Sequence, residues 1–387
     1  MRFVFIAEGK LMLKEAGREA VELESPFARE ATDRATARQA RHGWKQQERE
    51  AAGPFSARST WGRQAEATGD GAPTFRHAAR GAKPNELLYT LAMTASSGLF
   101  RYDLATREEL RMFHRQDFDS AGLSCATADG RVVLSSRDSD GLGKLELMDE
   151  ASRRRHTLTS GDGHDTEPVH HPAQPDLVYF QSAGAARNEN GEIVALGPAA
   201  ICRLNLASGQ LETVLEDERF DLLAPRVAAD GTLYYIRRPF HDRHNLPLGE
   251  KLKAFVLVPW HLAGALFGFL DAFSRLFGRQ PLKPAGGPDS LPARSRFATF
   301  QGLPVHLEKV LHARGKNPDD VQLVPGSWEL VRLRPDGDET IVARHVVAFD
   351  VGPDGAIVYS DGLRVWSAGN PSRLLHKGHI VQAVVII

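Results

Sequence analysis

Residues 118–158 read FDSAGLSCATADGRVVLSSRDSDGLGKLELMDEASRRRHTL, and this stretch decides the fold. It predicts four short strands in succession: Leu123–Thr127, Arg131–Ser136, Lys144–Met148 and Arg154–Leu158. The sequences A-D-G, S-D-G and D-E-A-S separate them, which is typical of tight turns between antiparallel strands.

The same pattern returns along the chain. Residues 165–215 repeat it, residues 220–236 begin another copy, and residues 328–360 carry the end of that copy and the start of the next. A four-strand unit that recurs every ~40–55 residues is the signature of a β-propeller blade. Such a unit buries both of its faces only by stacking against its neighbours. The sequence therefore predicts an all-β fold, a β-propeller.

The two ends of the chain each carry an incomplete unit. Residues 1–24 predict three strands, one short of a blade, and Ile380–Ile387 (IVQAVVII) is a strand without a unit of its own. We expect the C-terminal strand to be the innermost strand of the N-terminal blade, because this closure removes open sheet edges. The alternative is a hydrophobic tail that packs elsewhere.

The predicted propeller has six blades and two largely helical or loop insertions. The closing blade comprises 1–24 and 376–387, and the others are Arg76–Phe113, Phe118–Leu158, Asp165–Leu215 with Gly184–Ala199 inserted, Phe220–Ile236 continued by Trp328–Arg344, and His345–Leu375. As domains, 85–238 holds blade 2 to the first part of blade 5, 326–375 holds the end of blade 5 and blade 6, and 25–84 and 239–325 are the insertions.

Residues 161–182, GDGHDTEPVHHPAQPDLVYFQS, resemble the repeat of TolB-type propellers, D-x-x-P-x-aromatic-S-P-D-G-x-x-(I/L)-x-(F/Y). The matching positions are Asp165, Pro168, Pro172, Asp176 and Phe180. A histidine takes the aromatic place and P-D replaces D-G. The resemblance implies the propeller fold and a binding role, since scaffolds and enzymes share the repeat. A fainter similarity, to propellers encoded beside bacterial MoxR-type ATPases and von Willebrand A proteins, implies an AAA+ ATPase or von Willebrand A partner.

The first insertion begins with a helix. Ser25 fits the N-cap and Pro26 the first helical position, and the helix is expected to run to about Glu50. Basic residues recur on it at spacings of three and four, which places them on one face: Arg34, Arg38, Arg41 and Lys45. Such a face is either simply solvated or contacts an acidic partner.

The second insertion contains KLKAFVLVPWHLAGALFGFLDAFSRLFGRQPLKP (251–284), which predicts an apolar amphipathic helix from about Trp260 to Phe277. Its apolar surface includes Trp260, Leu266, Phe267, Phe269, Leu270 and Phe273. Polar residues and a proline interrupt it, whereas a membrane span needs about 20 apolar residues. The alternatives are docking into a partner, packing on the propeller, or lying at a membrane surface.

Acidic and histidine side chains recur where the innermost strands are expected to start. They are His77, Asp119, Asp165, Asp221, His345 and His379. These positions surround one mouth of a propeller's central channel, so the side chains form a candidate ligand or metal site with ligand types that suit a divalent ion or acid–base work. The alternative is structural, with each carboxylate accepting backbone hydrogen bonds between blades.

Composition excludes some functions. A net charge of −1 gives no reason to expect nucleic acid as a partner. Two cysteines on strands of different units are expected to be free thiols, which suits the cytoplasm, with peripheral contact at the inner membrane left open. No nucleophile, phosphate-loop or metal motif is present, so no cofactor is expected. The sequence favours a non-enzymatic scaffold that docks proteins through its faces and helical insertions. The alternatives are a metal-dependent hydrolase or lyase, or a small-ligand sensor, that uses the Asp/His positions.

Overall fold

The computed structural model describes residues 1–34, 36–37, 73–93, 96–116, 118–148, 154–240, 297–300, 303–306, 322–369, 371–378 and 380–387. The chain divides into two compact units. One comprises Met1–Pro239 and Ala298–Ile387, and the other comprises Phe240–Phe297. Apart from its two end residues, the second unit lies outside the described residues.

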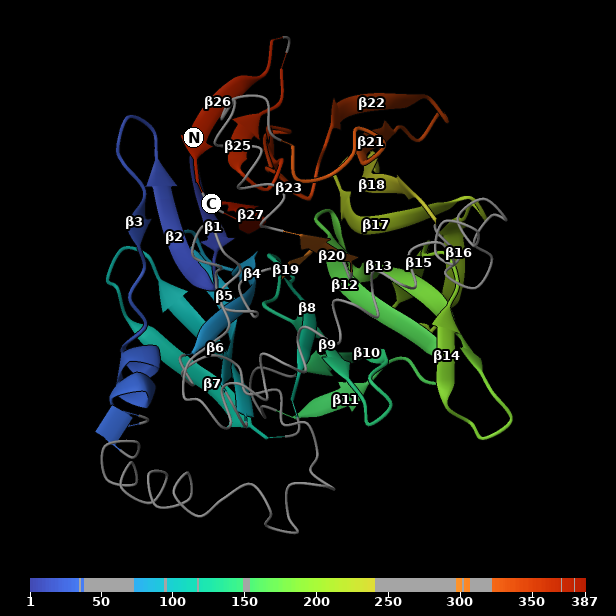
Figure 1. Ribbon diagram of the computed structural model, residues 1–387, viewed down its shortest axis with the longest axis horizontal. Coiled ribbons are helices and arrows are strands. Elements are labelled where there is room, and N and C mark those ends of the chain that lie inside the picture. The colour runs from blue at the N-terminus through green and yellow to red at the C-terminus, as the bar shows by residue number, and fades with distance from the viewer. Residues whose placement is uncertain are drawn as a thin grey trace, which may run out of the picture. The chain divides into compact units, whose positions relative to one another are not determined.

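Six antiparallel sheets of the first unit surround a common axis as the blades of a propeller (Figure 1). From the innermost strand outwards, blade 1 contains β27 (Val381–Ile386), β1 (Arg2–Ala7), β2 (Lys10–Glu15) and β3 (Val21–Glu22); blade 2 contains β4 (Thr74–Arg80), β5 (Glu86–Met93), β6 (Ser96–Asp103) and β7 (Glu109–Arg115); blade 3 contains β8 (Ser120–Cys125), β9 (Val132–Arg137), β10 (Gly143–Met148) and β11 (Arg155–Thr157).

The remaining blades follow the same order. Blade 4 contains β12 (Gly163–His171), β13 (Gln174–Arg187), β15 (Ala200–Asn205) and β16 (Leu211–Leu215), with β14 (Ile193–Leu196) paired to β13; blade 5 contains β17 (Phe220–Val227), β18 (Leu233–Pro239), β21 (Glu329–Leu333) and β22 (Glu339–Arg344); blade 6 contains β23 (Ala348–Val351), β24 (Ile357–Ser360), β25 (Arg364–Ser367) and β26 (Arg373–Lys377). The predicted all-β six-bladed propeller is confirmed.

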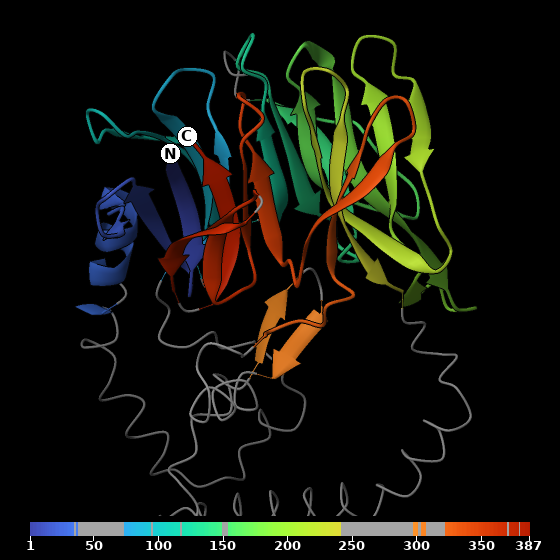
Figure 2. The same cartoon turned by 90° about the horizontal axis from the view of Figure 1, so that it is seen from above.

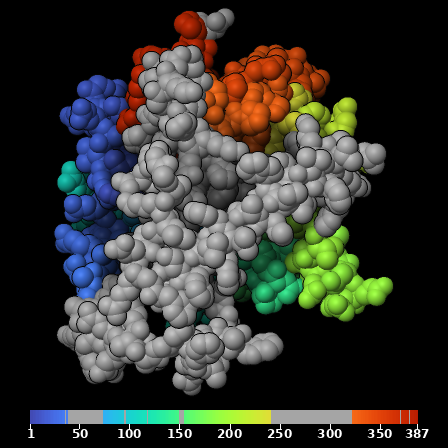
Figure 3. Space-filling model, viewed as in Figure 1, coloured from blue at the N-terminus to red at the C-terminus, as the bar shows by residue number. Residues whose placement is uncertain are grey.

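The C-terminal strand closes the propeller, as predicted. β27 pairs antiparallel with β1, placing Phe5 opposite Val384, and both side chains are 2% exposed. The N-terminal segment (blue) and the C-terminal segment (red) therefore lie side by side (Figure 3). Phe5 and Val384 belong to an apolar cluster that also contains Val347 and Val365 of the region around blade 6. The core thus lies between neighbouring blades, which is how single sheets bury both faces.

The two faces of the propeller differ (Figure 2). The chain passes from the outermost strand of one blade to the innermost strand of the next, so all innermost strands begin at one face. The hairpin of β13 and β14 and the segment between β18 and β21 both leave the repeat at this face, next to Gly163 and Phe220 respectively. We call it the insertion face, and the other the opposite face.

The first insertion is shorter than predicted. Its helix begins as expected, because Ser25 Oγ accepts the Ala28 N–H at 3.0 Å as an N-cap, and residues 26–34 and 36–37 are helical. The innermost strand β4 already begins at Thr74, however, inside the range 25–84 that was predicted as insertion. The predicted blade 2, Arg76–Phe113, overlaps the predicted insertion at this strand, and β4 belongs to the blade.

The second insertion is described only in part. β19 (Phe297–Phe300) and β20 (Leu303–His306) form a separate two-stranded sheet. Leu323 and Val324, inside the predicted range 239–325, are buried in the core beside Trp328. The predicted apolar helix, with its six interaction residues, lies outside the described residues. Within the described ranges, no helix is long and apolar enough to cross a membrane.

Candidate functional site

In the ranges that the structure describes, no hydrogen bond or ion pair joins two of the predicted Asp/His positions. Asp119 keeps 60% of its side chain exposed and pairs with Arg137 at 3.1 Å. His345 has a φ of 61° and its Nδ1–H donates to the Val324 carbonyl at 2.8 Å, which fixes the end of the second insertion. His379 lies outside the described residues.

Asp165 and Asp221 are buried and bonded to nearby groups. Asp165 Oδ1 accepts from Ser182 Oγ at 2.6 Å within blade 4. Asp221 Oδ1 accepts the Ala199 N–H of blade 4 at 3.0 Å, and its Oδ2 accepts from Arg238 Nε at 2.9 Å. In the described part of the chain, no hydrogen bond or ion pair joins any two of Asp119, Asp165, Asp221 and His345.

A different set of side chains gathers at the axis, beginning with His77 of β4. Ser120 Oγ of β8 lies 3.0 Å from His77 Nδ1, and His77 Nε2 lies 3.8 Å from Glu167 Oε1 of β12. Glu167 Oε2 lies 3.9 Å from Arg226 Nη2 of β17. These contacts connect the innermost strands of four consecutive blades.

Asp350 of β23 connects the remaining strands. Its Oδ1 lies 3.4 Å from Arg226 Nε, and its Oδ2 accepts the Ile386 N–H of β27 at 2.8 Å. The same carboxylate pairs with Arg80 Nη2 of β4 at 3.7 Å. Every innermost strand therefore contributes a group to one continuous network of polar contacts. We call it the axial ring: His77, Arg80, Ser120, Glu167, Arg226, Asp350 and the Ile386 N–H.

Two contacts place this ring on the axis. His77 of blade 2 reaches Glu167 of blade 4, although blade 3 lies between them. Arg80 of blade 2 reaches Asp350 of blade 6, although blade 1 lies between them. Non-neighbouring blades come this close only where the innermost strands converge (Figure 1).

Irregular backbone accompanies the ring residues. The pairing register of β12 shifts between Thr166 and Val169, and Glu167 has a φ of 51° immediately before Pro168. A bulge of this kind re-aims a side chain out of the regular alternation. Gly122 lies alongside, where a Cβ atom would come within 2.6 Å of Pro168 Cδ, so a side chain there would clash with the bulge.

The ring has no net charge at neutral pH. Arg80 and Arg226 carry two positive charges, and Glu167 and Asp350 carry two negative charges. Burial lowers the pKa of His77, and the opposing effect of Glu167 is smaller, so the imidazole is neutral. The ring therefore contains both positively and negatively charged side chains, whereas a metal site would gather several carboxylate or imidazole ligands. Across the described ranges, no cluster of three or more His, Cys, Asp or Glu side chains is arranged to hold a metal ion.

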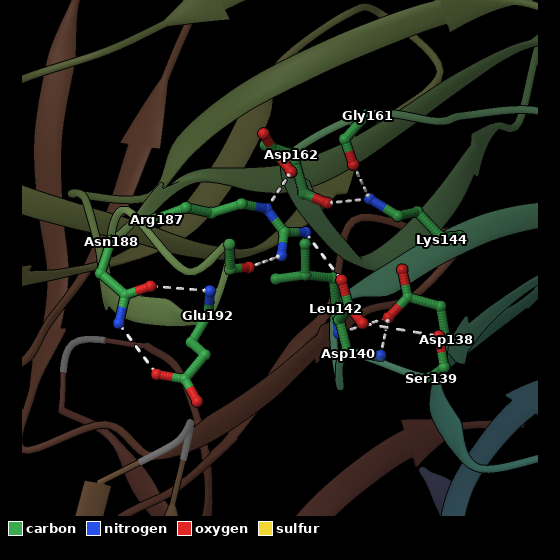
Figure 4. A network of polar contacts seen from close by, with 12 residues as sticks. Asp138, Ser139, Asp140, Leu142, Lys144, Gly161, Asp162, Arg187, Asn188 and Glu192 are labelled. Carbon is green, nitrogen blue, oxygen red and sulfur yellow. Dashed lines mark hydrogen bonds and ion pairs between the residues drawn. The ribbon is translucent and has the colours of Figure 1, made fainter.

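Charged contacts also fix the places where the chain leaves the repeat. Arg187 of β13 donates from Nε to Asp162 and from Nη2 to Asp140, both at 2.8 Å, which ties the β13–β14 hairpin to blade 3 (Figure 4). Arg238 bonds Asp221 and lies 4.9 Å over the Trp328 ring, which holds the two ends of the second insertion.

The start of the first insertion is held on the flank of blade 2. Glu109 Oε2 accepts the Phe27 N–H at 2.9 Å, and its Oε1 accepts from both Ser25 and Tyr89. Phe27 packs 4.9 Å from Phe100. Arg34 forms an ion pair with Glu30 on the exposed helix. The other predicted basic residues, Arg38, Arg41 and Lys45, lie outside the described residues.

Both cysteines are free thiols, as predicted. Burial raises the pKa of Cys202, so its thiol is protonated and unreactive at neutral pH.

Comparison with known proteins identifies the fold. No family model matches the sequence, and no curated protein matches it. Among solved structures, TolB from Acinetobacter baumannii superposes with a TM-score of 0.51 at 10% identity, covering 99% of this chain and 65% of the TolB chain. A chain in a nidogen/laminin complex gives a TM-score of 0.51 at 9% identity, covering 99% of this chain and 97% of the other.

A third structure, the tricorn protease, gives a TM-score of 0.47 at 12% identity, with 96% of this chain and 33% of that one covered. This chain thus spans about two thirds of the TolB chain, and it has the fold of TolB-type six-bladed propellers. At such identities the likeness defines the architecture alone.

Proposed function

We propose that this chain is a non-enzymatic interaction scaffold that docks protein partners on the insertion face of a rigid propeller. The observation that carries the proposal is that the described ends of the second insertion and the β13–β14 hairpin share this face, and that charged contacts fix each of them. Arg187 and Arg238 provide these contacts. A fixed platform with appended segments on one side suits assembly of several proteins, because pre-organised surfaces lose little entropy on binding.

The segment 251–284 is the proposed docking element, through its apolar residues Trp260, Leu266, Phe267, Phe269, Leu270 and Phe273. Its composition fits a partner groove or an anionic membrane surface. The partner classes expected from the faint sequence similarity are an AAA+ ATPase or a von Willebrand A protein, and the proposed location is the cytoplasm, at the inner membrane if lipid is the target.

The test replaces 250–284 by a short Gly/Ser linker in the otherwise complete chain. The propeller should remain folded, because extra or missing loop length costs little entropy. Capture of a specific partner, or co-sedimentation with anionic liposomes, should be lost, and the two assays separate protein from lipid. A second variant keeps the segment at full length and replaces Phe267 and Phe273 by Asp. It should lose the same association. Unchanged association in both variants would refute this role.

The competing function is a metal-dependent hydrolase or lyase centred on the Asp/His positions. The separation of these groups argues against this function, because Asp165 already bonds to Ser182 and Asp221 to Arg238. Elemental analysis of the purified complete chain tests it, and a stoichiometric divalent metal lost on Asp165→Ala would favour the enzyme.

A further inference from the structure

The charged side chains of the axial ring attract one another, but several of their hydrogen-bond donors and acceptors have no partner within the described residues. Charge-assisted hydrogen bonds between guanidinium and carboxylate are ordinarily about 2.7–2.9 Å long. The contacts of Arg226 with Asp350 and Glu167 are 3.4 and 3.9 Å, and that of Arg80 with Asp350 is 3.7 Å. These groups attract one another without forming the short bonds that such pairs normally make.

The unused donors belong to two guanidinium groups. Toward the residues that the structure describes, Arg80 donates from Nη2 alone, to the Val351 carbonyl at 2.8 Å. Within the same ranges Arg226 donates from Nη1 alone, to the Pro225 carbonyl at 2.8 Å. A guanidinium carries five N–H donors, so each side chain retains a fork of donors toward its surroundings. Forks of this geometry match the two oxygens of a carboxylate.

The unused acceptor is Glu167. Its two oxygens lie 3.8 Å from His77 Nε2 and 3.9 Å from Arg226 Nη2, and neither accepts a hydrogen bond within the described part of the chain. Asp350 differs, because it accepts the Ile386 N–H and is 6% exposed. Of the two carboxylates, only Glu167 is therefore available to a cationic group.

The same groups are accessible. The exposed side-chain fractions are 30% for Arg80, 21% for Arg226 and 22% for Glu167, although the three come from innermost strands. These three side chains therefore keep part of their surface exposed at the axis.

We propose that the axial ring binds a small zwitterion of the free α-amino acid class. The ligand carboxylate pairs with the guanidinium groups of Arg80 and Arg226, and its ammonium group donates to Glu167. A simple anion would be repelled by Glu167, and a simple cation by the two arginines, whereas a zwitterion matches both signs in a ring without net charge. This inference is independent of the proposed docking role.

The test is titration calorimetry of the complete chain with the common α-amino acids, each beside its N-acetylated and its carboxamide derivative. At least one amino acid should bind at millimolar concentration or below. Either derivative should bind about tenfold or more weakly, because one charge-assisted contact is removed in each. Absence of binding by every amino acid, or equal binding of acetate or inorganic phosphate, would overturn the proposal.

Variants locate the site. Arg80→Gln and Glu167→Gln should each weaken binding of the amino acid about tenfold or more. Glu167→Gln should leave the affinity for the N-acetylated derivative unchanged, because that derivative has no ammonium group to donate to Glu167. Arg131→Gln, which removes the ion pairs with Asp129 and Asp176 and alters no ring residue, is the matched control and should leave affinity unchanged. Circular dichroism identifies misfolding, and in that case Arg226→Lys, which retains the charge and loses the fork, supplies the same comparison. Undiminished binding in the folded variants would place the ligand elsewhere and refute the assignment.

Discussion

Asp350 on β23 accepts the backbone N–H of Ile386 on β27 at 2.8 Å, and this bond ties the closing strand to blade 6. The carboxylate is 6% exposed and also attracts Arg80 and Arg226. One side chain of the axial ring thus joins blade 6 to the closing blade.

Asp350→Ala should therefore destabilise the whole propeller. Removing the acceptor of the buried Ile386 N–H costs about 1–3 kcal/mol, and Arg80 and Arg226 also lose a carboxylate that attracts them. Urea unfolding of the complete chain measures the change. Asp33→Ala, on the exposed helix, is the control and should shift the midpoint little. Equal midpoints for both variants would show that the Asp350 contacts add nothing to closure.

Two positions of the closing strand β27, one buried and one exposed, allow a matched pair of substitutions. Val384 is 2% exposed and faces the core, whereas Gln382 of the same strand is exposed. Val384→Asp should prevent cooperative folding, since it buries an unpaired charge. Gln382→Asp should be tolerated. A thermal melt distinguishes them, and a near-native transition for Val384→Asp would contradict closure by β27.

Acid should destabilise the protein through His170. Burial lowers the pKa of this imidazole to about 4, from 6.5 in an unfolded chain, with Arg131 as a further cause. The unfolded state therefore binds a proton below pH 6.5 that the folded state does not, and stability present above pH 6.5 is lost as the pH falls toward 4. The loss is about 3 kcal/mol from this residue alone.

The free energy of unfolding, measured from pH 7 to 4, checks this prediction. His170→Phe should flatten the dependence in that window, because the phenyl ring does not titrate. His156→Gln alters an exposed imidazole and should leave the dependence unchanged. Identical slopes for His170→Phe and the unmodified chain would show that His170 does not govern the acid sensitivity.

Glu109 should control the start of the first insertion. Glu109→Ala removes the acceptor for Ser25, Tyr89 and the Phe27 N–H, which should cost about 1–3 kcal/mol locally. Hydrogen exchange should speed up at residues 26–34 while the innermost strands keep their protection. Glu108→Ala, the neighbouring exposed residue, is the control. Unchanged exchange at Phe27 would mean that the helix is held by other contacts.

The sequence predicted the architecture because propeller blades repeat locally. Strand spacing and turn residues sufficed for the six blades, and the unpaired strand Ile380–Ile387 predicted the closure. The predicted blade 2 began at Arg76, within β4, although the predicted insertion 25–84 overlapped the same strand. The free state of both cysteines also followed from their placement on different units.

The axial ring was largely missed, because its contacts join residues such as Arg80 and Asp350 from blades that are distant in sequence. Only His77 of the predicted set belongs to it. A local signal exists in the dipeptides Glu167–Pro168 and Ala224–Pro225, each with a positive φ before proline inside an innermost strand. Counting back from the first turn of each blade instead selected Asp165 and Asp221, which bond to Ser182 within blade 4 and to Ala199 and Arg238.

Docking on the insertion face is tested most directly by site-specific photo-crosslinking in the cells that make the protein. A photoreactive residue replaces exposed Asp119 or Glu189 on the insertion face, or exposed Glu108 or Asp336 on the opposite face. The first two positions should give discrete adducts with one or more proteins, identified by mass spectrometry, and the last two should give none. Adducts confined to the opposite face, or absent from all four positions, would contradict the account.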